Sequence, residues 1–572
     1  MRNKIDLSSD PDALFLNPWL DKGLKLLERP KYFWRKIPAS IIDGFSVSEH
    51  PEINQKIESF VADINRHKKF KAAVEIKSVP VVIERASFRK SHALAQEKLV
   101  LSGASGKRIL NSYRWEHAKE EEASADVLNL YFESCRKANE GLRIGEEKTF
   151  LESDLDFAIE CRNTFNFYHF ITESLTQLCV LDGLGFQGNI YFHFPNQEEK
   201  HRNFANAFVE ALFPEYAGRV FFERAPKDYD LVLTAYDFTT GICQMPEVDL
   251  EEMSEIMPEG VTLGTVGFSQ LLGMNSVTTA LLALRTRALK AVEGRDYSYL
   301  PKRFFVGRGD GQSRSRPLAG QDLLLEHLLR FGFEYVVFEE LEPLEQIAIM
   351  ARAEMMISHH GAGFTNMMFA NSEAYVIELG TLQTAKKRWS DFWPLATVSQ
   401  CRYISFFADF NNDDPLQEPT FANDGIVPTA VSSFGAAQIM TFVVAVLGRV
   451  PNMPNTSSLT VLAGRLLRAG AHEQASNLLR QHEHMVSNSF DLCILRADCH
   501  KALDQPKSEL IALELAYKAD SSIWQTLVRI VWCARRCERP QVIRWALSRL
   551  LIDFPERHEA FVTNHDWVRF VA

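Results

Sequence analysis

Short apolar runs alternate with helix-length stretches over much of the chain, and this alternation most limits the folds open to it. In the first half, an early β-like run at 80–83 is followed by runs at 157–159, 190–194, 219–222 and 231–233. Buried parallel strands have this near-continuous apolar character, and the intervening stretches are long enough for connecting helices. The pattern predicts an α/β fold.

The second half repeats the alternation. A strand is expected at 302–306, followed by a loop rich in Gly, Ser and Arg, a helix at 321–330, a strand at 334–338, a helix at 344–353, and strands at 355–357 and 375–379. Two successive doubly wound sheets account for both halves economically. Ligands of such sheets bind beyond the carboxyl ends of the strands, so we expect the functional residues there.

With 572 residues the chain is too long for a single core. We predict an N-terminal Rossmann-like domain with an extension over 1–290, a second Rossmann-like domain over 291–450, and a separate helical region over 456–572. The Pro/Asn-rich segment at 451–455 is the predicted linker, because only helical patterns follow it.

The helical region has a 34-residue self-similarity. Three positions illustrate it, occupied in successive units by Leu462, Arg496 and Ile530, by Ala463, Ala497 and Val531, and by Leu479, Leu513 and Leu547. This period is typical of tetratricopeptide-like helix pairs, which bury their apolar faces by stacking. Arg496 breaks an apolar position, so a plain helical bundle is the alternative.

Charge and targeting signals exclude several classes of protein. The net charge of −11 disfavours a protein that binds nucleic acid by neutralising phosphates. The sequence has neither a secretory signal at its N-terminus nor a run of about 18 apolar residues, which predicts no transmembrane segment. Nine single cysteines without a CxxC pair indicate reduced thiols. We therefore expect a cytoplasmic protein, either free or peripheral at the inner face of the membrane.

The most informative segment of the second half runs from Ile357 through His359, His360 and a Gly-Ala-Gly turn into an apolar stretch. Glycines let the backbone approach a ligand closely, and the start of a helix attracts phosphate. Upstream arginines could grip phosphate oxygens; they are Arg303, Arg308, Arg314 and Arg316. The alternative is a connecting turn beside a solvated basic face. No metal site is expected, because adjacent histidines on an extended chain point apart and no carboxylate nearby completes a ligand set.

The comparable segment of the first half reads NFYHFITES. If it is helical from about Asn166, His169 and Glu173 stand four apart on one face, where the carboxylate can orient the imidazole and raise its basicity. That arrangement suits a general base. The alternative is an ordinary surface pair on a helix that packs inward through Phe167, Phe170, Ile171 and Leu175.

These blocks, with RFFVGR and the long segment from Gly332 to Leu379, resemble glycosyltransferase family 61 over about residues 157–380. The family includes bacterial capsular polysaccharide biosynthesis enzymes and eukaryotic protein and xylan glycosyltransferases. The resemblance implies a GT-B fold, and inverting transfer of a sugar from a nucleotide-diphosphate donor to a glycan or polysaccharide acceptor. It implies no obligatory metal and no cofactor. Hexosyl, N-acetylhexosaminyl and pentosyl transfer stay open.

By position, the resemblance implies catalytic roles for His169 and Glu173. It implies a nucleotide-sugar site made of Arg308, Arg314, His360, Gly361, Ala362, Gly363, Thr365, Asn366 and Glu378. The segment 316–321 departs from the family pattern, because it lacks one Arg, an Asn and a Glu, and His359 replaces a Pro. These departures keep open a noncatalytic, transferase-like adaptor that acts through its helical repeats in polysaccharide assembly.

The region 456–572 lies outside the family core. Stacked helix pairs present an extended surface, so we expect a module that docks a protein partner and takes no part in bond making. The alternative is that these helices stabilise the enzyme itself.

Overall fold

The computed structural model describes residues 11–27, 30–89, 92–103, 105–106, 121–140, 155–161, 166–194, 204–308, 318–412, 414 and 416–570. The chain forms two compact units. The first comprises Met1–Ser46, His50–Leu318 and Phe333–Thr429, and the second comprises Val47–Glu49, Ala319–Gly332 and Ala430–Ala572.

An eight-stranded sheet with the order β10-β9-β8-β11-β5-β6-β7, and with β1 beside β5, lies in the first unit. Its strands are β1 (Leu24–Leu26), β5 (Ser78–Arg89), β6 (His92–Ala95), β7 (Lys98–Leu99), β8 (Phe157–Glu160), β9 (Ile190–His193), β10 (Val220–Glu223) and β11 (Lys227–Asp237). All the runs predicted in the first half form strands of this sheet.

The expectation of a purely parallel first sheet is wrong. Strands β8 to β11 pair in parallel, as predicted, but β5 is antiparallel to β11, β6 and β1, and β7 is antiparallel to β6. The physical reason is the length of the connections. Only two residues separate β5 from β6 and β6 from β7, whereas a parallel crossover needs about a dozen.

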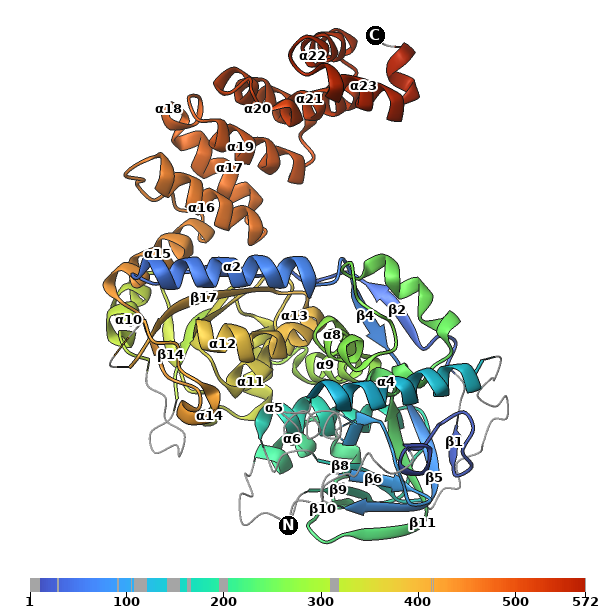
Figure 1. Ribbon diagram of the computed structural model, residues 1–572. Coiled ribbons are helices and arrows are strands. Elements are labelled where there is room, and N and C mark those ends of the chain that lie inside the picture. The colour runs from blue at the N-terminus through green and yellow to red at the C-terminus, as the bar shows by residue number, and fades with distance from the viewer. Residues whose placement is uncertain are drawn as a thin grey trace. The chain divides into compact units, whose positions relative to one another are not determined.

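In the second sheet, the pairings of β14, β13, β15, β16, β17 and β3 are parallel, as predicted. Its order is β14-β13-β15-β16-β17-β18, with β3 beside β17. The strands are β3 (Ile42–Ser46), β13 (Arg303–Val306), β14 (Glu334–Val336), β15 (Met355–His359), β16 (Tyr375–Thr381), β17 (Arg402–Phe410) and β18 (Thr429–Ala430). The predicted domain 1–290 thus lends β3 to this sheet, and the helix after it, α2 (Pro51–His67), packs on β3 and on α12 (Leu382–Lys387) (Figure 1).

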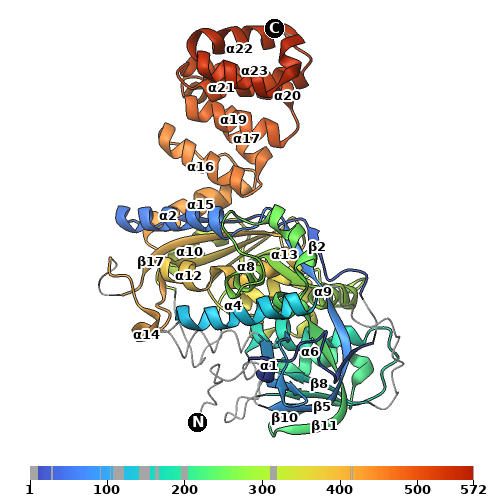
Figure 2. The same cartoon turned by 45° about the vertical axis from the view of Figure 1, so that its right-hand side comes forward.

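A small third sheet, which the sequence patterns did not indicate, joins β2 (Trp34–Ile37), β4 (Ala73–Ile76) and β12 (Ser276–Thr278). Figure 2 shows α4 (Glu121–Ala138) beside α8 (Val266–Asn275), two helices that are in contact. The other helices of ordinary α type in the unit are α1 (Pro11–Leu14), α5 (Phe167–His169), α6 (Phe204–Leu212), α7 (Phe238–Gly241), α9 (Thr279–Val292), α11 (Pro343–Ala351), α13 (Trp393–Ser399) and α14 (Phe421–Asp424).

Tighter or wider helical turns, labelled η, join these elements. They are η1 (Phe170–Ser174), η2 (Leu175–Leu181), η3 (Pro214–Tyr216), η4 (Ile242–Gln244), η5 (Glu247–Asp249), η6 (Glu251–Ile256), η7 (Phe338–Glu340), η8 (Ala362–Phe369) and η9 (Trp389–Phe392). One buried apolar cluster includes Phe157 and Ile190 from the first sheet and Phe304 and Met356 from the second. The two sheets therefore share a core.

The second unit is helical. It contains α10 (Gln321–Leu329), α15 (Ser433–Val446), α16 (Thr456–Arg468), α17 (His472–Gln481), α18 (Glu483–Val486), α19 (Phe490–Ala502), α20 (Pro506–Ala519), α21 (Trp524–Arg536), α22 (Pro540–Asp553), α23 (Pro555–Asn564) and η10 (Asp566–Phe570). Helices α16, α19 and α21 begin at intervals of 34 residues, and so do α17, α20 and α22 (Figure 2). Only helices follow the predicted linker in the described residues.

The positions that repeat every 34 residues in the sequence are buried in the structure. The eight apolar residues singled out at the three repeated positions are all buried. The ninth, Arg496, has a largely buried side chain whose Nη1 lies 2.6 Å from Oε2 of Glu483. Whether the pairs are of the tetratricopeptide type stays a prediction.

All nine cysteines are free thiols, eight of them buried, which agrees with the predicted reduced state. In the described part of the chain, no helix combines the length and the apolar character that crossing a membrane requires.

Candidate functional site

Three candidate residues, Arg308, His360 and His169, follow the carboxyl ends of strands, as the fold class predicts. Arg308 comes two residues after β13, and His360 directly after β15. Glu378 lies within β16, and His169 lies on the helical segment that follows β8. Arg303, in contrast, opens β13 at the opposite edge and pairs with Glu354 at 2.7 Å, which removes it from the site.

His169 and Glu173 form the predicted pair. The helical segment begins as expected at Asn166, whose side chain accepts a hydrogen bond from the backbone N–H of His169 at 3.4 Å. It widens into a π-helical turn over Phe170–Ser174, a feature that often marks functional sites. Nδ1 of His169 lies 3.2 Å from Oε1 of Glu173, and the side chains are 17% and 3% exposed. The geometric prediction is confirmed, whereas the catalytic role stays a prediction.

The same segment also packs inward, as the alternative interpretation described. Phe170, Ile171 and Leu175 are buried in the shared core. The two interpretations are compatible, because the apolar side chains anchor the helix while His169 keeps part of its ring exposed.

His360 forms a second histidine–carboxylate pair. Its Nδ1 lies 2.6 Å from Oε1 of Glu378, which is 1% exposed. The other carboxylate oxygen of Glu378 accepts hydrogen bonds from the hydroxyls of Tyr403 and Ser405. Burial, and then the charge of Glu378, raise the pKa of Tyr403 well above its ordinary value, so that Tyr403 donates. Glu378, predicted to bind the nucleotide sugar, is therefore placed to hold the ring of His360.

Arg308 lies against the backbone of the glycine turn. Its Nη2 donates to the carbonyl oxygen of His360 at 3.3 Å. Burial lowers the pKa of Arg308, but a guanidinium still carries its charge at neutral pH. A Cβ added to Gly361 would lie 2.9 Å from Nη2 of Arg308, so the absence of a side chain there gives the guanidinium its place.

The turn leads into η8. Ala362 and Gly363 form its partly exposed start. Thr365 and Asn366, also predicted to bind the nucleotide sugar, are fully buried, and Nδ2 of Asn366 donates to Oε1 of Gln346 at 3.0 Å. The side-chain amide of Asn366 thus ties η8 to α11. Arg314 and Arg316 lie outside the described residues.

Aromatic rings connect the two pairs. Tyr168 stands edge-on to the ring of His169, with the centroids 5.2 Å apart, and it also contacts Phe392 at 5.8 Å. Phe392 lies 5.4 Å from the ring of His360. In addition, the hydroxyl of Tyr168 donates to the backbone oxygen of Asp391 at 2.8 Å. Two aromatic rings, Tyr168 and Phe392, therefore connect the two histidines.

Sequence reasoning missed four residues of this region, namely Glu160, Phe392, Tyr403 and Ser405. Glu160 had a visible signal, since it is a charged residue that closes an apolar strand at the edge where ligands bind. The roles of Tyr403 and Ser405 depend on strand register, because Ser405 pairs with Glu378 across β16 and β17.

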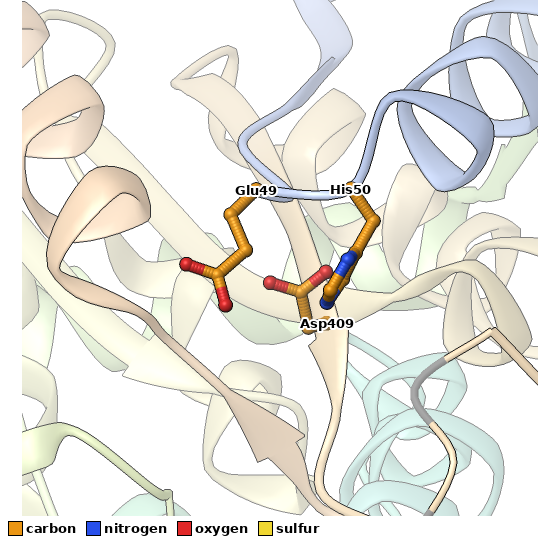
Figure 3. Close-up of side chains that lie close together, drawn as sticks. All are labelled: Glu49, His50 and Asp409. Carbon is orange, nitrogen blue, oxygen red and sulfur yellow. The ribbon is translucent and has the colours of Figure 1, made fainter.

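Three side chains of types that can ligate a metal ion lie close together. Among the described residues, the only group of three such side chains is Glu49, His50 and Asp409 (Figure 3). Glu49 belongs to the second unit, whereas His50 and Asp409 belong to the first. The group is thus not a site within one unit, and no metal binding is inferred from it.

One segment of the chain matches a family model, and it contains His169, Glu173 and His360 but not Glu378. Residues 167–377 match the family model of Glycosyltransferase 61. The match begins at the first residue of α5 and ends one residue before Glu378. It supports the resemblance to glycosyltransferase family 61 and, through it, a glycosyltransferase activity. No curated protein matches the chain. The capsular type, the GT-B arrangement and the nature of the C-terminal helices stay predictions.

Proposed function

We propose that the protein is an inverting glycosyltransferase of the GT-B type, which transfers a sugar from a nucleotide-diphosphate donor to a glycan or polysaccharide acceptor without an obligatory metal. One observation carries the proposal. Within and at the border of the segment that matches Glycosyltransferase 61, two histidines are each oriented by a buried carboxylate and are connected through Tyr168 and Phe392.

The acceptor side is assigned to His169. With Nδ1 directed at Glu173, the imidazole would take the proton of the acceptor hydroxyl through Nε2. The carboxylate stabilises the imidazolium that forms and fixes the tautomer of the neutral ring. The acceptor oxygen then attacks the anomeric carbon, the bond from that carbon to the diphosphate breaks, and the configuration inverts in this single displacement.

The donor side is assigned to Arg308, His360 and the turn at Gly361. Negative charge develops on the departing nucleoside diphosphate, and preorganised positive groups and N–H donors stabilise it. Arg308 supplies a fixed cation, the start of η8 supplies backbone N–H groups, and Glu378 holds the ring of His360 beside them. Arg314 belongs to the same proposal.

The helices of 456–572 are proposed to be a tetratricopeptide-like stack that docks a protein partner of polysaccharide assembly. The 34-residue spacing of these helices and the burial of their repeated apolar positions support this assignment. The reaction would take place in the cytoplasm or at the inner face of the membrane, where nucleotide sugars and a growing polysaccharide meet.

A panel of nucleotide sugars tests the function. We expect one of them to raise the melting temperature of the purified protein and to be hydrolysed slowly without an acceptor. The nucleoside diphosphate alone should also bind, because most of the donor contacts are assigned to the diphosphate. A protein that binds no nucleotide diphosphate and no nucleotide sugar of the panel would contradict the proposal.

A further inference from the structure

Phe392 lies between the segments that carry the two histidines. It is the last residue of η9, and only 4% of it is exposed. The centroid of its ring lies 5.4 Å from that of His360 and 5.4 Å from that of Phe364 on η8. It also lies 5.8 Å from the ring of Tyr168, the residue before His169. One buried ring therefore contacts the glycine turn, the element after that turn and the segment of the proposed base.

Element η9 also holds Tyr168 through its backbone. The hydroxyl of Tyr168 donates to the carbonyl oxygen of Asp391, the residue before Phe392, at 2.8 Å. The ring of Tyr168 stands edge-on to Phe392, with 76° between the planes, and edge-on to His169, with 82° between the planes. Edge-to-face contacts are a preferred arrangement of aromatic rings. Tyr168 is thus attached to η9 at two points, its ring and its hydroxyl.

The two sides of this contact belong to different sheets. The segment that carries Tyr168 and His169 follows β8 of the first sheet, whereas η9 follows β16 and α12 of the second sheet. α5 also contacts η8, the element after the glycine turn. The distance between the residue assigned to the acceptor and the turn assigned to the donor therefore depends on packing at η9.

Resting on the proposed roles of His169 and His360, we propose that Phe392 is a positioning residue for sugar transfer: together with Tyr168, it sets the distance between His169 and the glycine turn. In a single displacement the acceptor oxygen must meet the anomeric carbon at close range, and a misplacement of about 1 Å can cost about a hundredfold in rate. A buried ring is a suitable spacer, because a close-packed interior transmits a change in side-chain size to its neighbours. This role requires no contact between Phe392 and the substrate.

Phe392→Leu in the full chain tests the spacing, because it keeps an apolar side chain but makes it smaller. We expect kcat for sugar transfer to fall about tenfold or more, while donor affinity and the slow hydrolysis of the donor without acceptor stay within about twofold of the wild type. The matched control is Phe45→Leu, since Phe45 on β3 is 3% exposed and contacts Phe406 on β17. A merely structural role would lower the melting temperature of both variants and leave the ratio of transfer to hydrolysis unchanged. An unchanged ratio in Phe392→Leu would overturn the proposal.

Tyr168→Phe is a milder change, which is useful if Phe392→Leu folds poorly. It removes only the hydroxyl that donates to Asp391 and keeps the ring against Phe392. We expect the same separation of transfer from hydrolysis, with kcat lowered about threefold, as for the loss of one ordinary hydrogen bond. Equal loss of transfer and hydrolysis, or no loss of either, would overturn the role of this contact.

Hydrogen exchange of the peptide over 166–175 gives a reading that needs no substrate. Its amides should exchange several-fold faster in Phe392→Leu than in the wild type and in Phe45→Leu, because the segment of His169 loses its support from η9. Unchanged exchange would overturn the proposal. If even the wild type transfers no sugar, the proposed function fails, while hydrogen exchange still decides whether Phe392 holds this segment in place.

Discussion

At the scale of single residues, His169 and His360 have the same arrangement but are assigned different roles, His169 on the acceptor side and His360 on the donor side. Each directs Nδ1 at a buried carboxylate, Glu173 or Glu378, which leaves Nε2 for the reaction. Their surroundings differ. Arg308 lies at the backbone of His360, where it suits an anionic donor, whereas the segment of His169 is anchored in the apolar core by Phe170 and Ile171.

Arg308 carries the first prediction. Arg308→Ala should weaken the binding of a nucleoside diphosphate by about 1.5 to 3 kcal/mol, the range for a charge-assisted hydrogen bond. Arg303→Ala is the matched control, because Arg303 sits at the other end of β13 and pairs with Glu354. Calorimetry measures both variants, and an unchanged affinity in Arg308→Ala would remove this residue from the donor site.

Glu160 predicts how stability depends on pH. Because burial raises its folded-state pKa to about 7, above the ordinary value of 4.5, its contribution to stability is present below about pH 4.5 and is lost as the pH rises through 7. Glu160→Gln has no such loss and should gain up to about 3 kcal/mol relative to the wild type between pH 5 and pH 8. Denaturant unfolding at both pH values measures this gain, and a pH-independent difference would contradict it.

The sequence could predict the pair of His169 but not that of His360. Glu173 follows His169 by four positions along the helical segment, and local periodicity brings them together. The environment of Glu378 is built from three neighbouring strands, β15, β16 and β17, and Tyr403 and Ser405 reach it only through the register of β16 and β17. Sequence periodicity does not fix such a register between distant segments. Glu378 was therefore placed in the site by resemblance, without a physical role.

At the scale of elements, the site depends on the turn between β15 and η8, where residue 361 must have no side chain. Gly361 is extended, with φ of 178°, a conformation open to any residue. Its need for glycine comes from the guanidinium of Arg308, which lies where a Cβ would be.

Gly361→Ala should accordingly displace Arg308 without unfolding the protein. We expect donor affinity to fall about tenfold, as for the loss of one charge-assisted hydrogen bond, at an unchanged melting temperature. Gly273→Ala in α8 is the control, because no atom lies within 4 Å of its added Cβ. The double variant Gly361→Ala/Arg308→Ala should bind no more weakly than Arg308→Ala alone, and additive losses would contradict the shared mechanism.

Most elements of the second sheet were predictable, because buried parallel strands are apolar throughout and stand out from their helices. In the antiparallel half of the first sheet, the sequence predicted only the run 80–83 of β5. β5 carries Pro80 and ends in mixed burial, and β6 and β7 are too short to show a period. The π-helical turn over Phe170–Ser174 has no sequence signature either, since its wider turn results from packing.

At the scale of the whole molecule, the helical unit extends further toward the N-terminus than the predicted linker. α15 contacts α10, α16 and α17, and Arg465 of α16 donates to Oε1 of Gln438 on α15 at 2.9 Å. The predicted linker at 451–455 lies between α15 and α16, and packing continues across it.

Two truncated chains distinguish the two roles proposed for the C-terminal helices, which are docking a protein partner and stabilising the enzyme. A chain ending at Asp520 loses α21 to α23 but keeps α16 and α17 on α15, so it should stay soluble and hydrolyse the donor at the wild-type rate. A chain ending at Asn455 uncovers α15 and should aggregate more, while its soluble fraction keeps the hydrolysis rate. Light scattering and donor hydrolysis measure both effects. Loss of hydrolysis in the chain ending at Asp520 would show that the distal helices belong to the enzyme.

The most direct test of the central claim compares transfer with donor binding in His169→Ala. The account assigns this side chain to the acceptor and not to the nucleotide, so calorimetric donor affinity should stay within about twofold of the wild type. Sugar transfer should fall by about a hundredfold or more, the usual value of general-base assistance. A folded His169→Ala protein that keeps more than about a tenth of the wild-type turnover would contradict the assignment of His169 as the base.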